Sequence, residues 1–424
     1  MRLFLLLVLA SACSFKNSQL SNQVLKGHEE LYAEVDKAEK PDSIYKRIVI
    51  ASTNDIQGHL GANEVALPDG TISIGGKDVI SQYFSILRSQ YQNVVLVDSG
   101  DILPRDFQDL GKIKSFYEDL KYDALTLGID DFNLKLEKNM NSSVGLFKEF
   151  SKDNKTPLLL SNLYELKTAL NVEWEGSKPY LLKEVDGVKV GIIGLIPDDL
   201  VNLTSVQNRV GLFVENSVQS TMKHARLLRS LGAQIIVVLT HQGIDCSSKL
   251  SDKTNLPATK VNFEPRRSDV CDLSSPLGVF LERMPPHLVD VVVAGRNHQK
   301  MANFVNETLV IGGWENGKSF NYVEFFVDKE SKKLVPEKTI PHQPVLFCSE
   351  FFEATSDCYP EDQSVKHQNR IPAKFLGVKI EKPANVALIQ SDELFSSTES
   401  DIEDVVKKSG VAGRPYAETS KVPR

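Results

Sequence analysis

The feature that most constrains this chain is a repeated pattern in which a short, apolar, β-branched segment ends abruptly at polar residues. Residues 47–52 form such a segment, which stops at Thr53-Asn54-Asp55, and five later segments stop in the same way, at residues 93–97, 123–127, 158–160, 234–239 and 289–293. Apolar strands without polar alternation are typical of sheets buried on both faces. The pattern therefore predicts buried sheets with polar clusters at the carboxyl ends of their strands, where α/β folds place their sites.

Segments with helical periodicity separate the predicted strands, at residues 76–90, 113–120, 144–152, 217–231 and 277–284. Strands that alternate with helices indicate a layered α/β architecture. We expect one main domain at residues 47–345 and a cysteine-containing extension at 346–382. Residues 383–424 are polar and poor in aromatic side chains, which is typical of a flexible tail.

The first thirteen residues have the pattern of an export signal. Arg2 precedes an apolar run at residues 3–10, and small residues then lead to Cys13. This order is typical of a secretory signal, and its end at a cysteine resembles bacterial lipoprotein signals, which implies lipidation of Cys13. A plain secretory signal with an incidental cysteine is the alternative. Residues 14–46 are polar and predict a tether, so we expect an exported protein of the cell envelope, bound to the membrane by a lipid anchor.

Four further cysteines predict two disulfides, because an even number in an exported protein indicates pairing. Pairing of sequence neighbours, Cys246 with Cys271 and Cys348 with Cys358, is the simplest of the connectivities. Free buried thiols and a zinc site are the alternatives, but the chain has no C-x-x-C spacing that would favour zinc.

The charge balance argues against several partners. Lys and Arg number 49 and Asp and Glu number 56, so the formal net charge is −7. A mildly acidic protein has no general attraction to nucleic acid, and we expect no nucleic-acid partner. An unidentified protein or a phosphorylated small molecule stays open as the ligand.

Five polar motifs at the predicted strand ends carry a family resemblance. They are Asn54-Asp55-Ile56-Gln57-Gly58-His59, Asp98-Ser99-Gly100-Asp101, Gly128-Ile129-Asp130-Asp131-Phe132, Thr240-His241-Gln242-Gly243 and Gly295-Arg296-Asn297-His298. In this order they resemble the calcineurin-like metallophosphoesterases, above all the N-terminal domain of the 5′-nucleotidase branch. The resemblance covers about residues 47–330. It implies a four-layer αββα sandwich and phosphoester hydrolysis by two metal ions held by Asp, His and Asn.

Four ligand positions of the family pattern are retained, at Asp55, Asp101, His241 and His298, with Asp101 in the bridging position. Gln57 stands where the family has histidine, and it offers a carbonyl oxygen. The resemblance therefore implies that Asp55, Asp101 and His298, with Gln57, form a site for one divalent metal ion with reduced affinity. Whether that ion is Mn, Zn, Fe, Mg or Ca stays open, and so does a site that binds no ion.

Three other positions depart from the family pattern. Ile129 replaces the asparagine ligand, Asp130 the catalytic histidine, and Arg296 a histidine ligand. Isoleucine has no lone pair to donate, and a guanidinium stays protonated and opposes a metal ion. We hypothesise that Asp130 and Arg296 form an ion pair where the second metal ion would lie.

These departures predict a remodelled, catalytically impaired site in an exported metallophosphoesterase-like lipoprotein that acts as a binding or interaction module. The alternative is an active phosphoester or nucleotide hydrolase that uses the single residual metal site. The family's catalytic residues are substituted, so the sequence leaves open whether the protein is an enzyme.

Overall fold

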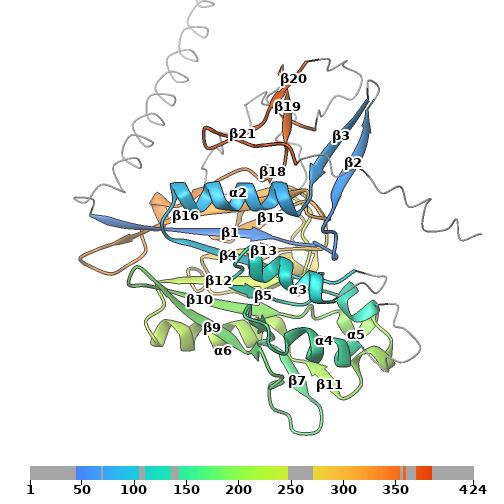
Figure 1. Ribbon diagram of the computed structural model, residues 1–424. Helices are drawn as coiled ribbons and strands as arrows, with labels where there is room; N and C mark the ends of the chain where they lie inside the picture. Colours follow the sequence, from blue (N-terminus) through green and yellow to red (C-terminus); the bar gives the residue numbers. More distant parts are fainter. Residues whose placement is uncertain are drawn as a thin grey trace, which may run out of the picture. The chain divides into compact units, whose positions relative to one another are not determined.

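Two large β-sheets lie at the centre of the fold, and the apolar segments of the sequence supply their strands (Figure 1). The computed structural model describes residues 44–67, 70–104, 110–134, 143–246, 271–353, 357–359 and 369–383. The predicted signal with Cys13, nearly all of the predicted tether and the predicted tail beyond residue 383 lie outside these residues. One compact unit extends as far as Lys382.

The first sheet has β1 near its centre and is largely parallel. β1 pairs in parallel with β4, and β5, β6 and β8 continue in the same direction, whereas β16 is antiparallel to β1 on its other side. The members in spatial order are β17 (Ile340–Pro341), β16 (Ser319–Asp328), β1 (Tyr45–Thr53), β4 (Val94–Asp98), β5 (Ala124–Leu125), β6 (Leu158–Leu159) and β8 (Ser177–Lys178), and β18 (Val345–Leu346) also pairs with β16.

The second sheet has four parallel strands between two antiparallel pairings at its edges. β10, β12, β13 and β15 are parallel, and β9 and β14 are antiparallel to their neighbours. The spatial order is β14 (Met301–Val305), β15 (Thr308–Gly312), β13 (Val291–Ala294), β12 (Ile235–Thr240), β10 (Val188–Leu195) and β9 (Tyr180–Val185).

Alternate side chains of each strand enter different cores, which stacks the layers. In β1, Ile48 and Ile50 pack in the core between the two sheets, while Val49 and Ala51 pack in the core beneath the helices of the first sheet. Strand side chains alternate between faces, so a strand apolar throughout can be covered on both.

Helices cover the outer face of each sheet, which completes the αββα sandwich that the sequence predicts. The core of the first sheet includes side chains of α2 (Lys77–Gln90), α3 (Leu110–Asp119) and α4 (Ser143–Ser151). The core outside the second sheet includes side chains of α6 (Ser217–Ser230) and α7 (Pro276–Arg283). Figure 1 shows α2 and α3 beside β1 and β4, and α6 beside β9 and β10.

Several small elements have no clear counterpart in the sequence pattern. Two strand pairs are β2 (Ala62–Leu67) with β3 (Gly70–Gly75), and β7 (Leu163–Glu165) with β11 (Leu212–Val214). Short helices are α5 (Leu200–Leu203), η2 (Asp130–Asn133), η3 (Val206–Arg209) and η5 (Pro336–Lys338). Near the C-terminus lie β19 (Glu350–Phe352), β20 (Arg370–Pro372), β21 (Lys374–Phe375) and β22 (Val378–Lys379).

The cysteine-containing extension packs on the helix-covered core of the first sheet. Phe347 and Phe375 lie 5.4 and 5.1 Å from the ring of Tyr83 in α2, between ring centres. Both predicted disulfides are confirmed, since Cys246 is bonded to Cys271 and Cys348 to Cys358. Within the part of the chain that the structure describes, no helix is long and apolar enough to cross a membrane.

Candidate functional site

The four retained ligand positions meet where strands of both sheets end. Asp55 follows β1, Asp101 follows β4, His241 follows β12 and His298 follows β13. His241 Nε2 lies 2.8 Å from Asp55 Oδ1 and 3.2 Å from Asp101 Oδ2. His298 Nε2 lies 3.1 Å from the same oxygen of Asp55. The structure thus brings together side chains that are up to 243 positions apart in the chain.

Left-handed backbone conformations mark the turns that carry these side chains. The φ angles are 53° at Asp55, 51° at Gln57, 53° at Asp101, 78° at Arg296 and 50° at His298. Such conformations are costly for residues other than glycine, and they cluster at functional sites. Five of them at one group of strand ends indicate that the surrounding fold holds these turns in place.

Two glycines allow the loops to approach the cluster closely. A Cβ atom at Gly128 would lie 2.0 Å from Asp101 Oδ1, and one at Gly295 would lie 2.6 Å from His241 Cδ2. Both contacts are shorter than any van der Waals separation, so only glycine leaves these side chains where they are.

Asn54 and Glu315 contact two of the candidate ligands, and the sequence pattern indicates no role for either residue. Asn54 Nδ2 donates to Asp55 Oδ2 at 2.7 Å and to the Gly313 carbonyl at 3.0 Å. Glu315 Oε2 lies 3.7 Å from His298 Nδ1. Asp55 and His298 therefore each have a neighbouring side chain that orients them, which is typical of metal ligands.

A second buried acidic layer lies beneath the cluster. Asp131 accepts three backbone hydrogen bonds, from the N–H groups of Ile102 (3.3 Å), Leu103 (2.8 Å) and Gly128 (2.8 Å). Burial raises the pKa of Asp131 to about 6, against these hydrogen bonds, and raises the pKa of Asp98 to about 7. Asp131 belongs to one of the quoted motifs, but only the structure shows that it ties the loops after β4 and β5 together.

The electrostatics of the cluster reflect carboxylates and imidazoles that share a buried space. Burial alone would lower the pKa of His241, but the charges of Asp101 and Asp55 outweigh it and raise that pKa to about 9. Burial works to raise the pKa of Asp55, but His241 and His298 together lower it below its usual value. Burial raises the pKa of Asp101 well above its usual value.

The residues present fit one divalent metal ion. Asp55, Asp101 and His241 are all buried, and each offers a ligand atom within 4.8 Å of the others. Burying several carboxylates beside one or two imidazoles leaves negative charge in a desolvated place, which a divalent cation compensates. Carboxylate oxygen with imidazole nitrogen suits metals such as Mn²⁺ and Zn²⁺. Gln57 is half-buried, and its backbone N–H donates to the Asp101 carbonyl at 2.8 Å.

The substituted positions lie on the other side of the cluster. Ile129 is 7% exposed and belongs to the core beneath the helices of the first sheet, so its side chain serves packing. The backbone N–H of Asp130 donates to Asp101 Oδ1 at 2.9 Å. The backbone N–H of Arg296 donates to Asp55 Oδ2 at 3.0 Å.

The predicted ion pair of Arg296 with Asp130 is wrong, because Arg296 pairs with another carboxylate. Its Nη1 donates to Asp199 Oδ2 at 2.7 Å, and among the described residues Asp199 is the carboxylate that pairs with this guanidinium. Asp199 follows β10, whose end lies in the same sheet as the end of β13, whereas Asp130 belongs to the loop after β5 in the other sheet. The sequence offers no signal for this pair beyond two aspartates after a predicted strand.

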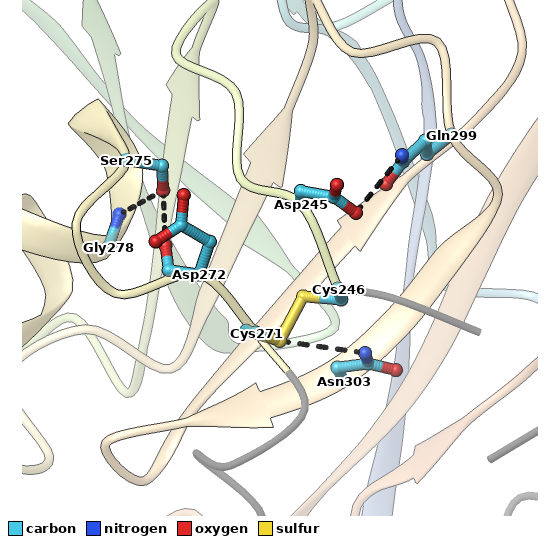
Figure 2. Close-up of a disulfide and its surroundings, with 8 residues drawn as sticks. All are labelled: Asp245, Cys246, Cys271, Asp272, Ser275, Gly278, Gln299 and Asn303. Carbon is cyan, nitrogen blue, oxygen red and sulfur yellow. Dashed lines mark hydrogen bonds between the residues drawn. A yellow bond between two sulfur atoms is a disulfide. The ribbon is translucent and has the colours of Figure 1, made fainter. Parts of the chain in front are cut away.

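The Cys246–Cys271 disulfide lies in the segment that follows His241, and Figure 2 shows it with its surroundings. Cys246 lies five residues after His241. Asp245, next to that cysteine, accepts from Gln299 Nε2 at 3.2 Å, and Gln299 follows His298 directly. This hydrogen bond therefore connects the loops of two candidate metal ligands, while the disulfide joins the first of these loops to Cys271, before α7.

Comparisons with known proteins agree with this fold. No family model matches the chain. The chain is 25% identical over 311 residues to the cell wall protein Lmo0130 of Listeria monocytogenes, a match that covers 68% of this chain and 38% of that protein. It is 27% identical over 209 residues to the snake venom 5′-nucleotidase of Naja atra, covering 47% and 37% of the two chains.

Among solved structures, the calcineurin-like phosphoesterase YfkN of Bacillus subtilis aligns with a TM-score of 0.52 at 18% identity. That alignment covers 71% of this chain and 90% of the solved one. The chain spans less than two fifths of the length of the two curated relatives named above. The structure has the fold of the calcineurin-like phosphoesterases, and the relatives of the chain include 5′-nucleotidases.

Proposed function

We propose that the protein is an exported, lipid-anchored relative of the 5′-nucleotidases that keeps one divalent metal site, binds a phosphorylated ligand there and is impaired in hydrolysis. Asp55, Asp101, His241 and His298 would hold the ion. The observation that carries the proposal is the asymmetry of the cluster. Asp55, Asp101 and His241 offer ligand atoms within 4.8 Å of one another, and His298 contacts Asp55. Ile129 and Arg296 stand at two other ligand positions of the family pattern.

A bound divalent ion would supply positive charge to polarise a phosphoryl oxygen. His298 is 40% exposed along its side chain and lies at the open side of the cluster, where a ligand can reach it. Asp55, Asp101 and His241 are buried and therefore serve the ion rather than the ligand. Without a second ion and with aspartate in place of the catalytic histidine, we expect hydrolysis to lose several orders of magnitude in rate.

The envelope location is supported by three independent features. The N-terminal pattern that ends at Cys13 is that of an export signal. The two disulfides fit an oxidising compartment. Two of its relatives are a cell wall protein and a snake venom protein, both found outside the cytoplasm.

The test is metal content measured together with turnover. The full chain, purified in detergent, is equilibrated separately with Mn²⁺ and Zn²⁺, and bound metal is counted by elemental analysis. Hydrolysis of an aryl phosphate is assayed beside the Naja atra 5′-nucleotidase as a positive control. We expect about one ion per chain and turnover more than about 1,000-fold below the control. Two ions with turnover near the control would reject the proposal, and one ion with such turnover would establish the single-metal hydrolase instead.

A further inference from the structure

Arg296 lies beside the cluster and forms an ion pair with a carboxylate on a distant loop. In the second sheet β12 lies between β10 and β13, and Leu195, Thr240 and Ala294 are in register at the carboxyl ends of these strands. Arg296 follows β13, and Asp199 follows β10. The ends of β10 and β13 are roughly 10 Å apart, since neighbouring strands lie about 4.8 Å from each other. The paired side chains of Arg296 and Asp199 therefore join the two loops that flank the loop beginning with His241.

The Asp199 side chain pairs with Arg296 and does not cap the helix α5 that follows it. It occupies the N-cap position of α5, where an aspartate usually accepts a hydrogen bond from the first turn. Its side chain makes no such capping bond. Oδ2 accepts from Arg296 at 2.7 Å, and Oδ1 is buried without a hydrogen-bond partner. A cap that is given up in this way indicates that the carboxylate orients the guanidinium.

The Arg296 guanidinium carries more N–H donors than the Asp199 carboxylate accepts. A guanidinium carries five N–H groups in a planar fork that matches two oxygens of a phosphate or carboxylate. Among the described residues, Asp199 is the side chain that accepts from it. The Arg296 side chain is 30% exposed, so ligand can reach the rest of the fork. The backbone N–H of the same residue donates to Asp55 Oδ2, which fixes the base of the side chain beside the candidate metal ligands.

We propose that Arg296 is an oxyanion-binding residue, positioned by Asp199, that contacts the phosphoryl group of the ligand beside the metal ion. This inference rests on the proposed function and adds to it the residue that selects a phosphorylated ligand. The buried aspartates nearby repel anions, so the guanidinium and the bound cation act together, and phosphate binds more tightly when the metal is present.

The experiment is calorimetric titration of inorganic phosphate into the metal-loaded full chain. Replacing Arg296→Met weakens phosphate binding about 10- to 100-fold, because charge-assisted hydrogen bonds are lost. Arg296→Lys keeps the charge but loses the fork, so it falls between wild type and Arg296→Met. Arg226→Met is the matched control, since Arg226 is an exposed residue of α6. Each variant is also checked for metal content and melting temperature.

A double-mutant cycle separates positioning from simple structural support. Asp199→Asn weakens phosphate binding several-fold in the wild-type background and has no further effect in the Arg296→Met background. Equal effects of Asp199→Asn in both backgrounds would reject the positioning role.

The outcomes distinguish this inference from the proposed function. If the chain binds one metal ion and Arg296→Met leaves phosphate affinity within about twofold of wild type, the inference is overturned while the metal site stands. If no metal binds but phosphate does, and Arg296→Met abolishes that binding, the inference stands and the proposed function falls. If neither metal nor phosphate binds, both are rejected.

Discussion

The two sides of the strand-end cluster differ in what they offer a ligand. On one side, His241 Nε2 lies 2.8 Å from Asp55 Oδ1 and 3.2 Å from Asp101 Oδ2, and His298 Nε2 lies 3.1 Å from the same Asp55 oxygen. On the other, Ile129 supplies a buried apolar side chain and Arg296 a permanent positive charge held by Asp199. The same scaffold therefore presents a candidate cation site next to a fixed positive charge.

The comparison indicates that a metal position whose ligands are replaced can be filled by other side chains. An isoleucine in the core fills space that a polar ligand would leave, and an ion pair between two strand ends supplies charge without a metal. We interpret the site as remodelled. The first three predictions change the cluster itself, and the last concerns a histidine outside it.

The largest effect is expected from restoring the family residues together. The triple substitution Ile129→Asn, Asp130→His and Arg296→His returns two ligands and the catalytic histidine. We expect metal content to rise from about one to about two ions per chain and aryl phosphate turnover to rise about 1,000-fold, because a second ion completes the phosphoryl clamp. Elemental analysis and a phosphatase assay measure the two quantities. Unchanged metal content in a folded variant would show that the difference lies elsewhere in the site.

Removing a ligand from the retained side comes next. Asp101→Ala deletes a buried carboxylate that contacts His241, so we expect Mn²⁺ affinity to fall more than about 100-fold, beyond the range seen for residues that merely support ligands. Calorimetric titration of Mn²⁺ measures this. Asp119→Ala, at an exposed aspartate of α3, is the matched control and leaves affinity unchanged. Equal affinity in Asp101→Ala and wild type would place the metal elsewhere.

A substitution that replaces no candidate ligand tests the close approach of the loops. In Gly295→Ala the new methyl group meets His241 Cδ2 at 2.6 Å, so the imidazole must shift. We expect Mn²⁺ affinity to fall about tenfold, as for changes that disturb ligand orientation. Gly145→Ala in α4 is the control, because nothing lies within 4 Å of a Cβ added there. The account of the retained side weakens if both variants bind equally well.

The smallest effect is expected on the pH dependence of stability, from the buried histidine His224. Burial and the charge of Lys223 lower the pKa of His224 in α6 to about 4, against the charge of Glu215, whereas the pKa of His241 is raised to about 9. Below pH 6.5 the unfolded chain takes up a proton at His224 and the folded chain does not. His224 therefore contributes a loss of stability, up to about 1 kcal/mol per pH unit, as pH falls from 6.5 towards 4.

The variant His224→Leu cannot titrate, so its stability curve is flatter than that of wild type across this window. Urea unfolding at pH 7, 6, 5 and 4 measures the difference between the two proteins. Parallel curves would mean that His224 titrates alike in the folded and unfolded states.

The layers were predictable because their signal is local. The apolar run of β1 and its stop at Thr53-Asn54-Asp55 specify both a strand and the loop that carries Asp55. The short β5 lies within a predicted segment, but the small strand pairs of the C-terminal extension carry too few residues for a periodicity. Their existence depends on tertiary contacts that a single segment does not encode.

The site was predictable where a motif places a ligand and not where a partner comes from another loop. Asp55 and His298 were expected together, and they meet. The pair of Arg296 with Asp199 depends on which strand ends lie side by side, and the order β13-β12-β10 is a property of the sheet that no single segment encodes. For the same reason the bond of Asn54 to Gly313 had no signal in the sequence.

The most direct test of the central claim is a crystal of the protein grown with excess Mn²⁺ and measured at the manganese absorption edge. We predict one anomalous peak per chain, bounded by Asp55, Asp101, His241 and His298, with the Arg296 guanidinium beside it and still paired with Asp199. Two peaks of similar height, with Arg296 displaced from Asp199, would contradict the claim that one ion site is kept and the other replaced.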